Sequence, residues 1–107
     1  MAYPGSIDAI TFGQFGSMYT DSTSVAITPP SGRVFAAITM LEEVTFDSSQ
    51  GLVSKDSTMF FNTESTGPGT CGVELASTQV FPRGVTIYGK WEKINLTSGS
   101  IVAYLGV

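Results

Sequence analysis

Histidine is absent from the chain, and cysteine occurs once, at position 71, so the residue types most used in catalysis are scarce. Nucleophilic catalysis by serine or cysteine needs a base within hydrogen-bonding reach, and that base is most often histidine. A lysine could replace it, but Lys55, Lys90 and Lys93 have no motif partner. No basic residue lies near Cys71 in the sequence to activate its thiol. We therefore predict a turn or core role for Cys71 and no enzymatic activity.

Acidic side chains are the other possible source of chemistry, and they are densest at Glu42, Glu43, Asp47 and Asp56. Neighbouring residues of a strand face opposite ways, so Glu42 and Glu43 cannot both enter one site on an extended segment. A carboxylate pair assembled across strands and a calcium site at Asp47 remain alternatives. The composition of residues 47–51 is that of an ordinary turn. We expect no catalytic residues, no cofactor and no metal.

Aromatic side chains could stack on sugars or nucleobases. Base stacking needs an accompanying basic groove, whereas this chain has 5 Lys+Arg against 9 Asp+Glu and a net charge of -4. We therefore predict no binding to nucleic acid. A neutral, hydroxyl-rich β-surface suits sugars, and the candidate sugar-binding residues are Tyr88, Trp91 and Tyr104. Packing in a core or a subunit interface is the alternative role for Trp91 and Tyr104.

The composition is typical of an assembly subunit. The 107 residues include 13 serines and 13 threonines, and only 13% are charged, about half the usual fraction. A chain of this length forms one domain. No run approaches the roughly 20 apolar residues of a membrane span, and the first residues do not resemble a signal peptide. We expect no membrane partner and synthesis in the cytoplasm.

Short runs of β-branched and aromatic residues, bounded by Gly, Pro, Asn and Ser, follow one another from residue 23 onward. This pattern predicts an all-β chain without a long helix, a single-domain antiparallel β-sandwich or jelly-roll-like fold over residues 25–107. The predicted strands cover residues 23–28, 34–41, 43–46, 52–54, 58–62, 72–76, 78–81, 85–90, 91–96 and 100–105.

Residues 34–41 are apolar on both alternating faces, which predicts an interior strand. The apolar phase changes near Glu92, which predicts a β-bulge. Ser98-Gly99 stands between two strand-like runs and predicts a hairpin tip. The predicted core residues are Val34, Ile38, Ile87, Ile94, Leu96 and Ile101.

Residues 1–24 differ from the rest because their apolar side chains follow no sustained period of 2 or 3.6. We interpret this segment as an irregular N-terminal arm that packs on its own domain or on a neighbouring chain. The alternative is a first strand of the domain itself. The candidate assembly-interface residues are Tyr3, Ile7, Ile10, Phe12, Phe15, Met18 and Tyr19.

Three stretches, residues 28–43, 81–91 and 98–106, resemble small virion structural proteins of tailed bacteriophages that infect marine bacteria or cyanobacteria. The resemblance covers about residues 25–107, and its motifs are turn-and-strand patterns without a chemical signature. Such proteins include capsid decoration or cement proteins, head fibres and tail parts, often β-rich and trimeric.

The resemblance implies a non-enzymatic decoration or cement protein on the capsid surface of the virion. It would bind the major capsid protein and reinforce the contacts between capsomers, and a homotrimer is the expected state. The alternative is a carbohydrate-binding adhesin or a tail or head-fibre module for host attachment.

Overall fold

The computed structural model describes residues 15–55 and 59–107. Every element assigned within these residues is a β-strand, which confirms the all-β prediction. The strands are β1 (Ser17–Thr20), β2 (Val34–Met40), β3 (Thr45–Phe46), β4 (Leu52–Ser54), β5 (Thr86–Ile94), β6 (Leu96–Ser98) and β7 (Ile101–Gly106).

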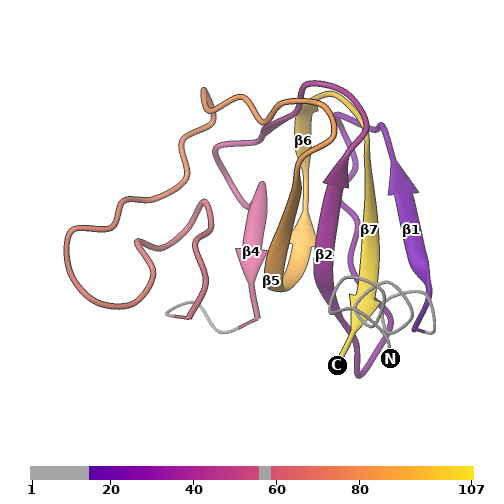
Figure 1. Cartoon of the computed structure of the whole chain (residues 1–107), viewed down its shortest axis with the longest axis horizontal. Helices are drawn as coiled ribbons and strands as arrows, with labels where there is room; N and C mark the ends of the chain where they lie inside the picture. Colours follow the sequence, from indigo (N-terminus) through magenta and orange to yellow (C-terminus); the bar gives the residue numbers. More distant parts are fainter. Residues whose placement is uncertain (1–14, 56–58) are drawn as a thin grey trace, which may run out of the picture.

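The strands form two antiparallel sheets over one hydrophobic core, consistent with a β-sandwich. Five strands in the order β1-β7-β2-β5-β4 make the large sheet, and β3 pairs with β6 in the small one (Figure 1). Val44, Phe46 and Leu96, from the small sheet and the residue before it, join the same core cluster as the large sheet. A loop that extends from the β4 side connects β4 to β5 (Figure 1).

Strand β2 lies at the centre of the large sheet, between β7 and β5. Five of its seven residues are buried, as the apolar character of both faces predicted. Phe35, Ile38 and Met40 point into the core. Of the predicted core residues, Val34, Ile38, Ile94, Leu96 and Ile101 are buried, and Ile87 is half-buried against the core cluster.

The predicted phase change near Glu92 is present. Val53 pairs with Lys93, and Ser54 pairs with Trp91, so Glu92 is the extra residue of β5 opposite β4. This bulge brings Trp91 and Ile94 onto the same buried face although they are three positions apart.

The predicted hairpin at Ser98-Gly99 is wrong. Strand β6 pairs with β3, whereas β7 pairs with β1 and β2, so the chain passes here from the small sheet to the large one. Gly99 has a φ of +92°, and a Cβ atom at this position would lie 2.3 Å from the Glu43 carbonyl oxygen. The glycine is therefore needed for a close crossing of two backbones.

Several short runs that were predicted as strands lie in loops. Residues 23–28 and 78–81 contribute only the isolated bridges Ile27–Ile94 and Val44–Phe81, and residues 59–62 and 72–76 form no strand. Positive φ angles at Gly67, Gly69 and Cys71 turn the chain repeatedly. Composition alone indicates strands here, but apart from these two bridges no neighbouring strand pairs with these runs.

The expected arm includes a strand. Residues 17–20 form β1, which pairs with β7 from Ser17–Tyr104 to Thr20–Ile101, so the irregular interpretation of residues 1–24 is wrong for this stretch. Met18 packs against the core and Thr20 is buried. A strand of four residues, of which only Met18 and Tyr19 are apolar or aromatic, is too short to show a period in the sequence. The candidates Tyr3, Ile7, Ile10 and Phe12 lie outside the described residues.

Candidate functional site

One side of the large sheet faces away from the core and carries three of the candidate tyrosines. The strand register sets Tyr19, Val102, Thr39 and Thr86 in one row across β1, β7, β2 and β5. The next row holds Ser17, Tyr104, Ala37 and Tyr88. Paired residues of neighbouring strands point to the same side of a sheet. We call these eight residues the tyrosine face.

The tyrosine face carries no charged side chain. Tyr19 and Tyr88 are each 60% exposed, and Tyr104 is half-buried. The hydroxyls of Thr39 and Thr86 form a hydrogen bond of 2.9 Å across β2 and β5. The face therefore combines aromatic rings with hydroxyl groups on four hydrogen-bonded strands.

Acidic groups lie at one corner of this face, beside Tyr19. Desolvation raises the pKa of the Tyr19 phenol above its ordinary value of 10.0, and the carboxylates of Asp21 and Glu42 raise that pKa further. Ser100 donates a 2.7 Å hydrogen bond to the Glu42 carboxylate, so the carboxylate is held near the start of β7. Tyr19 therefore remains a neutral hydrogen-bonding group over a wide range of pH.

Trp91 is completely buried, so it cannot stack on a sugar, and its place among the sugar-binding candidates was wrong. Its ring packs edge-on against Phe61, with centroids 5.5 Å apart, and against Phe60 at 6.4 Å. The indole N–H donates a 3.1 Å hydrogen bond to the Phe61 carbonyl. A Cβ atom on Gly89 would lie 2.9 Å from the Trp91 ring, so the glycine makes room for it. Trp91 anchors the β4–β5 loop to the sheet.

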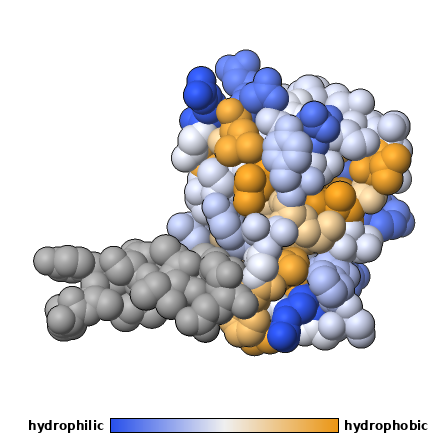
Figure 2. All heavy atoms as spheres, turned by 90° about the vertical axis from the view of Figure 1, so that its right-hand side faces the viewer, coloured by the Kyte–Doolittle hydropathy of each residue, from blue (hydrophilic) through white to orange (hydrophobic). Residues whose placement is uncertain are grey.

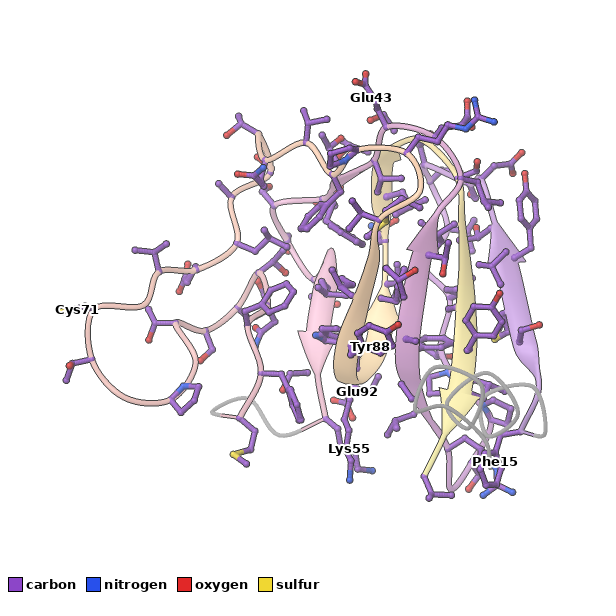
Figure 3. All side chains as sticks on the ribbon, viewed as in Figure 1. Phe15, Glu43, Lys55, Cys71, Tyr88 and Glu92 are labelled. Carbon is purple, nitrogen blue, oxygen red and sulfur yellow. The ribbon has the colours of Figure 1, made fainter. Side chains whose placement is uncertain are left out.

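The described arm candidates lie in three different environments. Phe15 is half-buried beneath the Arg33 guanidinium, whose Cζ atom is 4.8 Å from the ring centroid. Met18 packs on the core of its own domain, so it is not a surface residue of an arm. Of the three, only Tyr19 belongs to the tyrosine face, which also includes Tyr88 and Tyr104. Figure 3 labels Tyr88 of this face.

Figure 2 views the molecule from the side of β1. Hydrophobic residues on this side alternate with weakly hydrophilic ones and do not merge into one continuous apolar area. The weakly polar appearance agrees with the abundance of serine, threonine and tyrosine. Within residues 15–55 and 59–107, no helix is long and apolar enough to cross a membrane.

The residues considered for catalysis do not come together in the described structure. Cys71 is exposed in the β4–β5 loop, where its φ is +72° (Figure 3). No group of three or more acidic or cysteine side chains in the described segments is arranged to hold a metal ion. Asp47 instead accepts a 2.9 Å hydrogen bond from the Ser49 backbone N–H, as in an ordinary Asx turn.

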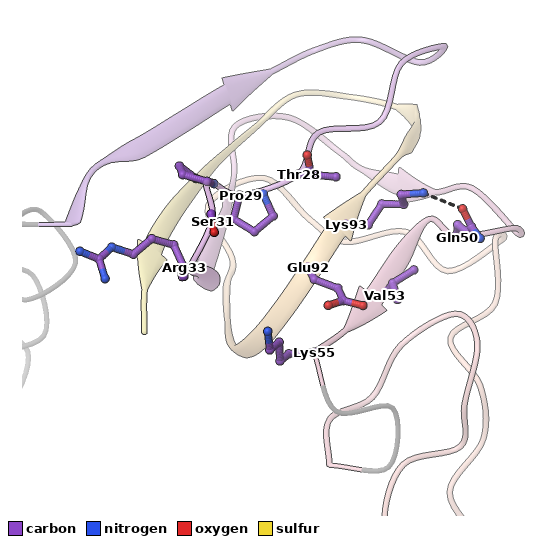
Figure 4. A pocket seen from close by; sticks show the side chains of 11 residues that line it. Thr28, Pro29, Ser31, Arg33, Gln50, Val53, Lys55, Glu92 and Lys93 are labelled. Atoms are coloured by element: carbon purple, nitrogen blue, oxygen red, sulfur yellow. Dashed lines mark hydrogen bonds between the residues drawn. The ribbon is translucent and has the colours of Figure 1, made fainter.

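A groove that the sequence did not predict lies between the loop of residues 28–33 and strands β4 and β5 (Figure 4). Its volume is about 470 Å³, and it is lined by residues that include Lys55, Glu92 and Lys93. Lys55 is far along the chain from Glu92 and Lys93. The pairing of Val53 with Lys93 in the sheet, which brings them together, could not be predicted from the sequence.

No family model, curated protein or solved structure matches the chain.

Proposed function

We propose that this chain is a non-enzymatic structural protein of a bacteriophage particle, a decoration or cement protein that binds the major capsid protein. The resemblance of residues 25–107 to small virion proteins supports this role. The low charge content, 13% of residues, supports it as well, because the centres of protein interfaces are depleted of charged residues. The protein would be made in the host cytoplasm and would lie on the capsid surface.

The observation that carries the proposal is the tyrosine face. Interfaces are enriched in tyrosine and depleted of lysine and glutamate, and tyrosines are frequent among the residues that dominate binding energy. Two exposed tyrosines, Tyr19 and Tyr88, stand on strands β1 and β5 of one rigid sheet. Burying the exposed part of each would contribute about 2–3 kcal/mol. A partner that covers both would gain enough to offset part of the cost of association.

Assembly as a homotrimer belongs to the same proposal. Apolar side chains such as Val73 and Val80 are 79% and 46% exposed on the β4–β5 loop. Contacts between copies would remove these side chains from water. Trimers bound at multi-subunit junctions would connect neighbouring capsomers and so reinforce the shell.

The test is the binding of purified protein to particles that lack it. The substitutions Tyr19→Thr and Tyr88→Thr remove the exposed rings and keep a residue that favours strands. We expect the double variant to fold and to cosediment with particles at least about tenfold less tightly. The matched control is Val25→Thr, which removes an exposed apolar side chain outside both the tyrosine face and the proposed trimer contact. Unchanged binding by the tyrosine variant would refute this interface.

A carbohydrate-binding adhesin, or a tail or head-fibre module, is the second candidate function. The exposure of Tyr88, 60%, favours it, because the ring is accessible and lies in the same row of the sheet as Tyr104, with Ala37 between them. The copy number per particle separates the two functions. A capsid decoration protein occurs in hundreds of copies, whereas a tail or vertex protein occurs in few.

A further inference from the structure

The two edges of the large sheet differ in how their backbone groups are bonded. Strands β4 and β1 lie at these edges (Figure 1). At the β4 edge, the Thr63 N–H donates a 2.9 Å hydrogen bond to the Leu52 carbonyl, and the Leu52 N–H donates a 3.1 Å bond to the Thr63 hydroxyl. Thr63 is buried. These bonds close the start of the β4 edge against a further strand.

The outward backbone groups of β1 follow from its pairing with β7. The Leu105 N–H donates a 2.9 Å bond to the Gly16 carbonyl, and hydrogen-bonded pairs alternate along an antiparallel ladder. Met18 and Thr20 therefore bond to β7, whereas the backbone N–H and C=O groups of Ser17 and Tyr19 point away from it. Within residues 15–55 and 59–107, no strand pairs with this outer edge and no loop backbone bonds to these groups.

Strand β1 lacks the features that protect an edge strand. Edge strands commonly carry charged side chains, a proline or a bulge, which hinder pairing with another chain. The sequence of β1 is Ser-Met-Tyr-Thr, and its register with β7 is regular. An edge of this kind is a template for a further strand.

Charges of opposite sign lie at the two ends of β1. Near its start, the Arg33 guanidinium lies over the Phe15 ring, with the Cζ atom 4.8 Å from the ring centroid (Figure 3). Asp21 directly follows its end, and there Glu42 accepts a 2.7 Å hydrogen bond from Ser100. An antiparallel neighbour of the same sequence would bring its own start, with a cation, beside this acidic end. Charge complementarity therefore favours a second copy of the chain as the partner.

We propose that β1 pairs with β1 of a second copy in an antiparallel, twofold-symmetric contact centred on Met18. Ser17 of each copy then pairs with Tyr19 of the other, so every outward backbone group of both β1 strands is bonded. The two large sheets become continuous, and their tyrosine faces adjoin. The contact lies at the opposite edge from the β4–β5 loop (Figure 1), so it is distinct from the proposed trimer contact and does not depend on capsid binding.

The first test is the mass of the intact protein in solution, measured by analytical ultracentrifugation. The mass should double between about 10 µM and about 1 mM, because a contact of two short strands is small and weak. Ser17→Pro removes an outward N–H that does not bond to β7, and it should weaken this step at least about tenfold. Ser17→Thr keeps the N–H and is the matched control. An unchanged mass at about 1 mM, or equal weakening by Ser17→Thr, would overturn the proposal.

Disulfide formation tests the register. Directly opposed residues that do not exchange hydrogen bonds have Cα atoms about 4.5 Å apart, within the range that a disulfide spans. Met18→Cys should therefore form a disulfide-linked dimer under mild oxidation. Tyr19 and its copy would be diagonal neighbours about 7–8 Å apart, so Tyr19→Cys should link poorly. Both variants carry Cys71→Ser, because Cys71 is exposed. Equal linking by the two variants would contradict the Met18-centred pairing.

A charge exchange tests the choice of partner. Arg33→Glu should weaken the association at least about threefold, and adding Asp21→Arg to it should restore the association, because opposite charges then meet again. Unchanged association in Arg33→Glu, or no restoration in the double variant, would overturn the antiparallel contact between copies. Circular dichroism of each variant checks that a loss of association does not reflect a loss of folding.

Amide hydrogen exchange identifies what covers the edge. The Ser17 and Tyr19 amides should be protected at about 1 mM protein and exchange rapidly at about 10 µM, whereas the Met18 and Thr20 amides, bonded to β7, should be protected at both concentrations. Protection of Ser17 and Tyr19 that does not depend on concentration would show that residues 1–14 of the same chain cover the edge. Rapid exchange at both concentrations would leave the edge to a strand of another protein. Either result would overturn the proposal.

Discussion

Replacing Trp91 with phenylalanine should loosen the β4–β5 loop before it unfolds the domain. The variant removes the indole N–H that bonds to the Phe61 carbonyl at 3.1 Å, and it shortens the ring that packs against Phe60 and Phe61. Leaving the partly buried Phe61 carbonyl without its donor costs about 1–3 kcal/mol. The space left by the smaller ring adds about 1 kcal/mol. We expect a loss of about 2–4 kcal/mol from a total of about 5–15 kcal/mol.

The assay combines urea unfolding, followed by far-ultraviolet circular dichroism, with cleavage by a glutamyl endopeptidase. Glu64 follows the buried residues Asn62 and Thr63, and the Thr63 N–H bonds to the Leu52 carbonyl at 2.9 Å. Cleavage after Glu64 therefore requires this part of the loop to leave β4. In Trp91→Phe the cleavage rate should rise about tenfold or more, because the loop opens at a lower free-energy cost.

The control for this experiment is Ile38→Val, which removes one buried methyl group from the centre of the large sheet. It should lower the unfolding free energy by about 1 kcal/mol with a much smaller effect on cleavage after Glu64. The anchoring role of Trp91 would be refuted if Trp91→Phe lost stability while its cleavage rate matched that of Ile38→Val.

Two further predictions concern Gly99 and Tyr19. Gly99→Ala should lower the unfolding free energy by more than about 2 kcal/mol, because a methyl group would meet the Glu43 carbonyl and the Val44 side chain at a φ of +92°. Gly32→Ala, at a φ of +80° with open space around it, should cost only about 1 kcal/mol by the same urea titration. The Tyr19 phenol should ionise above pH 10.0, since its pKa is raised, and phenolate absorbance compared with Tyr19→Phe identifies its titration. A raised pKa means that the folded state holds the proton more tightly, so this stabilising contribution is present below pH 10.0 and is lost as the pH rises through the folded pKa. Asp21→Asn should bring the titration closer to pH 10.0; an unchanged midpoint would remove Asp21 as a cause.

Local patterns in the sequence predict the structure correctly where a residue's environment depends on a single strand. The run at residues 34–41 is apolar on both faces, and a central strand covered on both sides is the arrangement that buries it. The change of phase near Glu92 required an extra residue in β5, because side chains alternate strictly along a strand. Both features are properties of single strands, so the sequence contained them.

Pairing between strands was decided only by the tertiary structure. Ser98-Gly99 has the composition of a hairpin turn, yet Gly99 serves a close crossing toward Glu43, whose position depends on the small sheet. The runs at residues 59–62 and 72–76 have strand-like composition but no partner strand. Residues 17–20 looked irregular and became β1, because the edge of β7 pairs with them.

The candidate site, too, could be predicted from the sequence only in part, and the tertiary structure decided the rest. Aromatic composition and low charge indicated a surface for sugars or partners, and these are properties of the sequence itself. Register placed Tyr19, Tyr88 and Tyr104 on one side of the sheet, while the bulges of β5 turned Trp91 into the core. The groove around Lys55 and Lys93 joins residues from two strands and a distant loop. Their meeting depends on contacts between segments far apart in the chain, and no periodicity within one segment encodes such contacts.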